Sequence, residues 1–199
     1  MKGSDMKKLN QQNYDSAVNY VNSLFDKYSK LQVLRLDLSY QKEHANKLTV
    51  KDAKQDIQHL LNNRRSKPSL FADCVGHMWK LESTPEKGPH FHAAFFYDGS
   101  KVEKDAHKAS KIGKYWEDRI TEGRGLHFNC NAKKAEYEKC GIGKISHSDE
   151  EMRSNLLSEV LPYLTKEDQS IDSVKSGNER CFGKGVPAKR KSKAGRPRE

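Results

Sequence analysis

Two histidines, His90 and His92, are the residues of this sequence best suited to metal chemistry. Alternate residues of a β-strand point to the same face, so both imidazoles would converge on one spot while Phe91 points into the packed layer. If a hairpin places Glu82 across from His90, its carboxylate becomes a third ligand. A divalent cation held there would withdraw charge from a scissile phosphate and orient it for in-line attack.

Two other interpretations of the histidine pair stay open. The pair could lie on the exposed face of a half-buried strand and bind nothing. It could also form a hydrolytic zinc site, because imidazole suits zinc whereas magnesium prefers oxygen ligands. The apolar residues that follow His92 and the carboxylate of Glu82 upstream favour a metal site over surface histidines.

Cleavage of a phosphodiester through a covalent intermediate needs a nucleophile, and Tyr163 is the candidate. Its phenol would attack phosphorus, store the cleaved bond as a phosphotyrosine and leave a free 3′-hydroxyl for rejoining without ATP. Lys166 lies three residues further on, a spacing that shares a helical face, where an ammonium would neutralise the developing phenolate or hold the phosphate. The alternative is a core tyrosine at a helix end beside a solvated lysine.

Helices and strands must alternate to position these groups. Three- and four-residue spacing of apolar residues predicts an amphipathic helix over 11–30, and alternation of apolar and polar residues predicts a strand over 31–40. Thr49 is the expected N-cap of a second helix, which ends before Pro68. The histidines then fall in the second strand of a hairpin.

That hairpin consists of predicted strands over 71–82 and 90–97, joined by residues 83–89, whose prolines and glycine exclude a regular element. Further predicted elements are a helix over 104–121 and strands over 126–129 and 141–145. A last helix opens near Ser148, and Pro162 should kink or end it where Tyr163 occurs.

Three ordered segments resemble the motifs of HUH endonucleases, which include rolling-circle initiators, relaxases and related transposases. The segments are Leu34-Arg35-Leu36-Asp37-Leu38-Ser39, Glu82 with His90-Phe91-His92, and Tyr163-Leu164-Thr165-Lys166. The layout over about 11–172, especially Gly88-Pro89-His90-Phe91-His92, is most similar to the prophage and inovirus-type replication proteins of the YagK/YfjJ-like group.

The resemblance implies an α+β fold, a central antiparallel sheet with flanking helices in the Rep-like, ferredoxin-like topology. It also implies Mg²⁺ or Mn²⁺ at His90 and His92, Glu82 as third ligand, Tyr163 as the catalytic tyrosine and Lys166 as its electrostatic helper. No second tyrosine lies near Tyr163, which departs from the two-tyrosine initiators and favours single-tyrosine chemistry. The sequence has no complete phosphate loop, so we expect no ATP binding and a host helicase as partner.

The formal net charge of +10 indicates a polyanionic partner, either nucleic acid or an acidic membrane surface, although much of the excess follows Gly183. No apolar run is long enough to cross a bilayer and no secretory leader is visible, so we expect a cytoplasmic protein. The four cysteines lack a Cys-x-x-Cys pairing, which argues against a zinc ribbon or a redox motif.

We expect the chain to divide into a flexible N-terminus over 1–10, an endonuclease-like domain over 11–172 and a disordered basic tail over 173–199. Residues expected to contact DNA are Arg35 and, in the tail, Lys189, Arg190, Lys191, Lys193, Arg196 and Arg198. The Gly-Arg-Pro core at 195–197 resembles an AT-hook for the minor groove. A solvated tail that adds nonspecific phosphate affinity is equally compatible with this composition.

The leading hypothesis is a metal-dependent nickase that initiates replication of a phage or mobile element on single-stranded or extruded origin DNA. A transposase or a mobilisation relaxase would use the same residues. Two alternatives of different class are a DNA-binding regulator that does not cleave, and a zinc-dependent phosphodiesterase that uses water in place of Tyr163.

Overall fold

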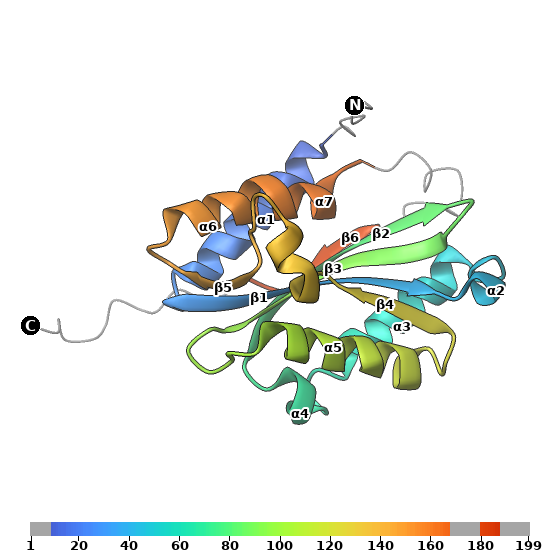
Figure 1. Ribbon diagram of the computed structural model, residues 1–199. Coiled ribbons are helices and arrows are strands. Elements are labelled where there is room, and N and C mark those ends of the chain that lie inside the picture. Colours follow the sequence, from blue (N-terminus) through green and yellow to red (C-terminus); the bar gives the residue numbers. More distant parts are fainter. Residues whose placement is uncertain (1–8, 168–179, 188–199) are drawn as a thin grey trace, which may run out of the picture.

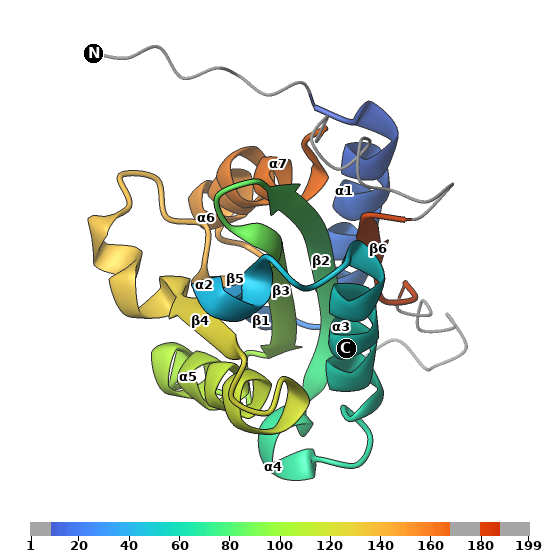
Figure 2. The same cartoon turned by 90° about the vertical axis from the view of Figure 1, so that its right-hand side faces the viewer.

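An open sheet of antiparallel strands forms the centre of the computed structural model, which describes residues 9–167 and 180–187 (Figures 1 and 2). Its strands run in the order β4-β1-β3-β2-β6, and β5 also pairs with β1. The strands are β1 (Lys30–Tyr40), β2 (Cys74–Thr84), β3 (Gly88–Asp98), β4 (Gly125–Asn129), β5 (Gly143–Ser146) and β6 (Phe182–Lys184).

Helices connect the strands and cover both faces of the sheet. The α-helices are α1 (Gln11–Phe25), α2 (Lys42–Ala45), α3 (Val50–Asn62), α4 (Pro68–Phe71), α5 (Asp105–Tyr115), α6 (Glu150–Asn155) and α7 (Leu161–Thr165). Two π-helical segments, η1 (Trp116–Ile120) and η3 (Leu156–Val160), and a 3₁₀-helix, η2 (Cys130–Glu136), complete the described part. Strand order 4-1-3-2 in a β1-α3-β2-β3-α5-β4 chain is the ferredoxin-like topology, so the predicted α+β fold is confirmed.

Each face of the sheet has its own apolar core. Leu34, Leu36 and Leu38 of β1 pack with α3 and α5 on one face, and Leu31 and Val33 pack with α1, α6 and α7 on the other. Arg35 and Asp37 continue the row of Leu31 and Val33, because alternate strand residues share a face. Arg35 and Asp37 therefore lie on the side of α7.

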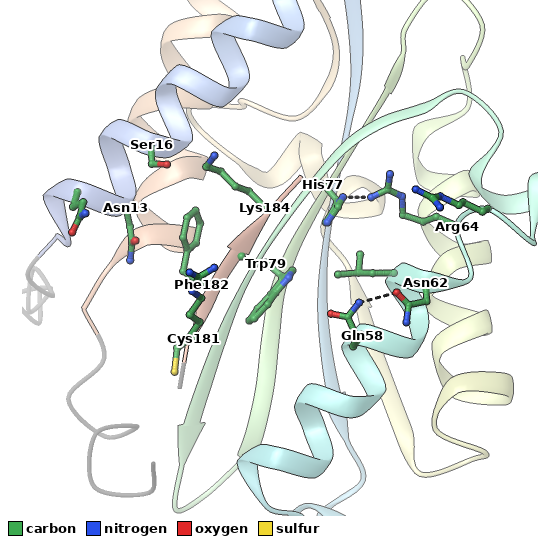
Figure 3. A pocket seen from close by; sticks show the side chains of 15 residues that line it. Asn13, Ser16, Gln58, Asn62, Arg64, His77, Trp79, Cys181, Phe182 and Lys184 are labelled. Carbon is green, nitrogen blue, oxygen red and sulfur yellow. Dashed lines mark hydrogen bonds between the residues drawn. The ribbon is translucent and has the colours of Figure 1, made fainter. Parts of the chain in front are cut away.

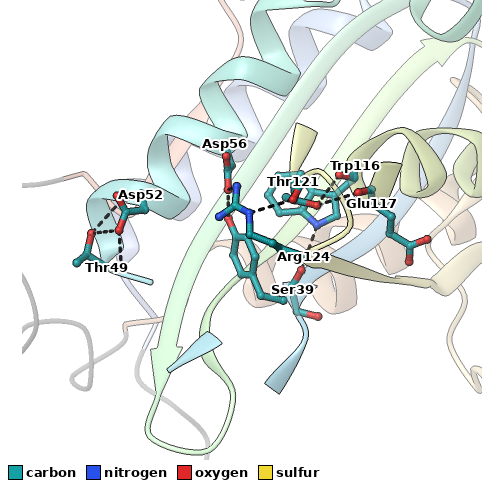
Figure 4. A network of polar contacts seen from close by, with 9 residues as sticks. Ser39, Thr49, Asp52, Asp56, Trp116, Glu117, Thr121 and Arg124 are labelled. Atoms are coloured by element: carbon teal, nitrogen blue, oxygen red, sulfur yellow. Dashed lines mark hydrogen bonds and ion pairs between the residues drawn. The ribbon is translucent and has the colours of Figure 1, made fainter. Parts of the chain in front are cut away.

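Polar contacts fix the start of α3 and the C-terminal end of β1 (Figure 4). Thr49 Oγ1 accepts from the Asp52 N–H at 3.1 Å, and Asp52 Oδ2 accepts from the Thr49 N–H at 2.9 Å, which confirms the predicted N-cap as a capping box. The Tyr40 hydroxyl donates to Asp56 Oδ2 at 2.9 Å, and Arg124 Nη2 lies 3.6 Å from the same oxygen. Both carboxylates of α3 are thus engaged at β1 and the helix start.

The structure corrects the predicted hairpin. Residues 83–89 were expected to be irregular, but β2 extends to Thr84 and β3 begins at Gly88, and Gly88 adopts a φ of +63° in the turn. Pro89 is tolerated because β1 stops pairing with β3 at Phe91, which leaves one side of β3 an edge. The predicted strand start at Phe71 is also wrong, since Pro68 opens α4 there.

Pro162 was expected to kink or end the last helix; the helical run does not end there, although the π-helical segment η3 directly precedes α7. Pro162 lies in the first turn of α7, where the missing N–H of a proline costs no helical hydrogen bond. The helix ends only at Thr165, so Tyr163 lies in its final turn and Lys166 follows it in an extended conformation.

The end of the first helix and the beginning of the predicted tail also differ from expectation. The first helix, expected over 11–30, ends at Phe25, and β1 begins at Lys30. Phe182–Lys184, placed in the tail by composition, form β6 against Met78–Lys80 of β2. The six basic tail residues, Lys189 to Arg198, lie outside the described residues. Among the described helices, none combines the length and the apolar character required to span a membrane.

His77 of β2 should make the stability of the fold depend on pH. Burial, followed by the charge of Arg64, which donates to His77 Nδ1, lowers the pKa of His77 to about 3. The unfolded chain takes up that proton below its ordinary pKa of 6.5, so stability is complete above pH 6.5 and declines as the pH falls. His77 should contribute a loss of ~2 kcal/mol to the free energy of unfolding between pH 7 and pH 5, which urea denaturation measures.

The His77→Gln variant is the control for this prediction. It keeps a side-chain acceptor for Arg64 but cannot take up a proton. Its unfolding free energy should lack this share of the pH dependence. An unchanged dependence on pH in the variant would show that other groups cause the acid destabilisation.

Candidate metal centre

Glu82, His90 and His92 lie together at the turn end of the β2–β3 hairpin, as the sequence predicted. The register pairs Glu82 with His90, so the three even-numbered residues share the face of α7. Glu82 Oε2 lies 3.8 Å from His90 Nε2 and 3.7 Å from His92 Nε2. All three ligand atoms are within 4.8 Å of one another, a spacing that one metal ion could bridge.

The outer nitrogens of both imidazoles are fixed by oxygen acceptors. His90 Nδ1 lies 3.0 Å from the carbonyl oxygen of Gly88, and His92 Nδ1 lies 2.7 Å from Asp37 Oδ1. Each Nδ1 therefore carries the donated proton, and in the neutral ring each Nε2 keeps its lone pair. Metal-binding histidines in proteins are oriented in this way.

The charges of the triad follow from its surroundings. Burial opposes the charge of Glu82, but contacts with His92 and Lys166 outweigh burial and lower the pKa of Glu82 to about 2. Burial lowers the pKa of His90. It also opposes the charge of His92, yet Asp37 and Glu82 raise the pKa of His92 overall. At neutral pH Glu82 is a carboxylate and His90 a neutral imidazole, the states in which both bind metals.

The donor set fits a divalent cation. Two imidazole nitrogens and one buried carboxylate leave coordination positions open for water or for a phosphate oxygen. Transition-metal ions such as Mn²⁺ and Zn²⁺ accept this mixture of nitrogen and oxygen, and a carboxylate with water ligands also suits Mg²⁺. The triad is compatible with a metal, and its donors do not by themselves select one of these ions.

Asp37 is a site residue that the sequence analysis did not assign. It pairs with His92 across β1 and β3, and Arg35 Nη2 lies 3.8 Å from Asp37 Oδ1. The signal was present, because Asp37 belongs to the polar side of the alternating strand, but its neighbour could not be read from the sequence. Its carboxylate orients the His92 ring.

Replacing Asp37 by asparagine should weaken metal binding. The amide can still contact His92, but it no longer supports the charge that the ring gains on coordination, so Mn²⁺ affinity should fall about 10- to 100-fold. Isothermal titration calorimetry measures this effect. Glu117→Gln is a matched control, because Glu117 Oε1 lies 2.7 Å from His127 Nδ1 in a similar pair away from the triad. Equal losses in both variants would contradict the assignment of Asp37.

Tyr163 and Lys166 lie at the same place as the triad. The Tyr163 ring centroid is 6.1 Å from that of His92, and the side chain is 47% exposed, so it is not a core tyrosine. Arg35 Cζ lies 4.4 Å from the Tyr163 ring centroid. Lys166 Nζ lies 5.1 Å from the same centroid and 3.0 Å from Glu82 Oε1. A tyrosine, two cations and the triad therefore form one cluster.

The position of Lys166 differs from the expected one. It does not share a helical face with Tyr163, because α7 ends before it. Instead, Leu9 bridges to Lys166, and the Asn10 N–H donates to the Thr165 carbonyl at 3.0 Å. Buried Leu161 and Leu164 anchor α7 on the sheet. These contacts turn the lysine back toward Glu82.

Of the residues expected to contact DNA, Arg35 is the one that lies within the described part of the chain. Its side chain is 13% exposed, so it belongs to the cluster and does not project from the surface. Beside it, Arg35 and Tyr163 line a hollow of about 410 Å³ together with Tyr137, Glu138, Glu159 and Val160. A group bound in this hollow would touch the Tyr163 side chain.

A family model of the YagK/YfjJ C-terminal domain matches residues 2–185. No curated protein and no solved structure matches the chain. Because the family match spans almost the whole sequence, this protein belongs to the YagK/YfjJ C-terminal domain family.

Proposed function

We propose that this protein is a metal-dependent endonuclease of the HUH type that nicks single-stranded DNA through Tyr163. The proposal depends above all on one observation: a half-exposed tyrosine ring lies 6.1 Å from His92 of the candidate metal triad. The ordered likeness of β1, the histidine pair and the tyrosine segment to the HUH motifs supports it. A membership in the HUH superfamily is part of this proposal.

Tyr163 would supply the covalent step. Its phenolic oxygen would form a bond to phosphorus while the bond between phosphorus and the 3′-oxygen breaks. The phenolic proton would pass to solvent, and the leaving 3′-oxygen would take up a proton to become a hydroxyl. Mg²⁺ or Mn²⁺ held by Glu82, His90 and His92 would supply Lewis-acid polarisation of the phosphate. The product would be a phosphotyrosine joined to the 5′ end of the downstream strand, with a free 3′-hydroxyl on the upstream strand.

Two cations support this role of Tyr163. Arg35 and Lys166 both lie against its ring, so both would stabilise the negative charge of the transition state and attract the anionic substrate. Lys166 in addition holds Glu82 at 3.0 Å and so couples the nucleophile to the metal ligands. Lys166 therefore contacts both the nucleophile and a metal ligand, and the role we assign to it is electrostatic.

The substrate we infer is single-stranded or extruded origin DNA of a phage or mobile element. The hollow of about 410 Å³ beside Tyr163 is lined by Glu136, Glu138 and Glu159 as well as by Arg35 and Lys139, so it would hold an unstacked base of the substrate and not a phosphate. Such a substrate places the activity in the host cytoplasm and requires a host helicase but no ATP site in this chain. A transposase or relaxase would use the same cluster.

The test incubates the protein with labelled single-stranded DNA from its own replicon and Mg²⁺ or Mn²⁺. A covalent protein–DNA adduct on a denaturing gel, absent when the metal is chelated, is the expected result. Binding without adduct or cleavage in both metals would favour a regulator. Cleavage without an adduct would favour a phosphodiesterase that uses water.

A further inference from the structure

We propose that a basic groove at the β6 edge of the sheet binds a strand of single-stranded nucleic acid, separately from the metal triad. The groove consists of two adjoining hollows. One, of about 1200 Å³, lies between α1, β6 and α3, and the other, of about 560 Å³, runs along α3 (Figure 3). They share Gln58, Asn62 and Trp79, and Figure 2 shows β6 between α1 and α3.

The described lysines and arginines that line the groove give it a positive charge. Its cations are Lys51, Lys54, Arg64, Arg65, Arg180 and Lys184. Among the described residues, no carboxylate lines either hollow. Asp52 and Asp56 belong to the same helix, α3, but they are bonded to Thr49 and Tyr40 (Figure 4). This separation of charge on α3 favours a polyanion in the groove.

The groove also offers an aromatic ring and amides. Trp79 is partly exposed and lines both hollows. Gly183 of β6 lies so close to Trp79 that a Cβ would be 2.5 Å from the indole, so a side chain there would displace the ring. Gln12, Asn13, Gln58 and Asn62 supply amide donors and acceptors. Bases stack on such rings and bond to such amides.

These features together favour a single strand over other anions. A duplex turns its phosphates outward and keeps its base faces stacked on one another, so Trp79 inside the groove could not stack on a base of a duplex. A lipid surface would meet only the outermost cations, because the amides and the indole line a concavity. The two hollows, of about 1200 and 560 Å³, together exceed the roughly 300–1,000 Å³ of a pocket for one small ligand, which favours a strand over a mononucleotide.

Tryptophan fluorescence can report the groove directly. The sequence has two tryptophans, and Trp116 is 0% exposed, so a change on titration with oligothymidylate of about 16 nucleotides would come from Trp79. We expect quenching in the presence of a chelator. Trp79→Phe should lose the signal, while fluorescence anisotropy of the labelled oligonucleotide still reports binding.

Salt dependence provides the second test. In Lys51→Ala/Arg65→Ala the slope of log K against log salt should be smaller in magnitude by about 1.4, because each phosphate contact on a single strand contributes about 0.7. Lys51 and Arg65 are exposed, so the fold should tolerate the change. Lys111→Ala/Lys114→Ala is the matched control, since both lysines are exposed on α5 and line neither hollow. The control slope should stay unchanged.

Three results would overturn the proposal: equal slopes in the two double variants, equal quenching by thymidine monophosphate at the same phosphate concentration, or quenching by phosphatidylglycerol vesicles but not by the oligonucleotide. The inference does not rest on the proposed nicking activity, because binding is measured without metal. Normal quenching of the Trp79 fluorescence without adduct formation would contradict only the proposed nicking activity. Adduct formation without quenching would contradict only the groove.

Discussion

Replacing Tyr163 by phenylalanine should abolish the covalent protein–DNA adduct and leave folding and metal binding intact. The substitution removes the oxygen that would bond to phosphorus and keeps the ring beside Arg35 and His92. Because the side chain is 47% exposed, the loss of its hydroxyl opens no cavity in the core. The covalent step needs that oxygen, so adduct formation should fall by about 10⁴-fold or more.

Tyr137→Phe is the matched control for this experiment. Tyr137 lines the same hollow as Tyr163, so its loss tests whether any nearby phenol suffices. The control should form the adduct at the rate of the unmodified protein on denaturing gels. If Tyr163→Phe still formed an adduct, the nucleophile would be another residue. If it cleaved DNA without an adduct, water would be the nucleophile.

The elements nearest the site were predictable because their patterns are long. Strict alternation over Leu34, Leu36 and Leu38 gives β1 an apolar side. The same period of two puts Glu82, His90 and His92 on one face when the hairpin pairs Glu82 with His90, as the structure does. Thr49 was equally readable, since a capping box needs only residues close together in sequence. Local signals were sufficient for these features.

The arrangement of the short strands was not predictable. β4 pairs with residues 36–40 of β1, and β5 pairs with residues 30–33 of the same strand. Nothing in a segment of four or five residues selects its partner strand, because that choice depends on the packing of the helices between them. β6, with only Phe182–Lys184, is too short to show a period at all.

The site was predictable only in part for the same reason. Glu82, His90 and His92 lie within one hairpin, so local register brings them together. The contact of Asp37 with His92 depends on β1 pairing with β3, and the contact of Lys166 with Glu82 depends on how α7 docks. Contacts between segments far apart in sequence need the tertiary fold.

Replacing Glu82 by glutamine should remove metal binding. The amide keeps the shape of the side chain but lacks the charge that faces both Nε2 atoms, at 3.8 Å from His90 and 3.7 Å from His92. We expect Mn²⁺ affinity to fall by at least about 100-fold, more than for a residue that only orients a ligand. Calorimetry with Mn²⁺ measures the affinity. Adduct formation should fall in parallel and recover in part at high Mn²⁺ concentration.

Lys166→Met tests the lysine of the Lys166–Glu82 ion pair separately from the carboxylate. The ammonium of Lys166 lies 3.0 Å from Glu82 Oε1 and competes with a cation for that carboxylate, so its removal should leave Mn²⁺ affinity unchanged or higher. Adduct formation should nevertheless fall about 100-fold, because the phenolate of Tyr163 loses a nearby positive charge. If Lys166→Met instead weakened Mn²⁺ as strongly as Glu82→Gln, the lysine would act by holding the carboxylate in place. The electrostatic role assigned to it beside Tyr163 would then be wrong.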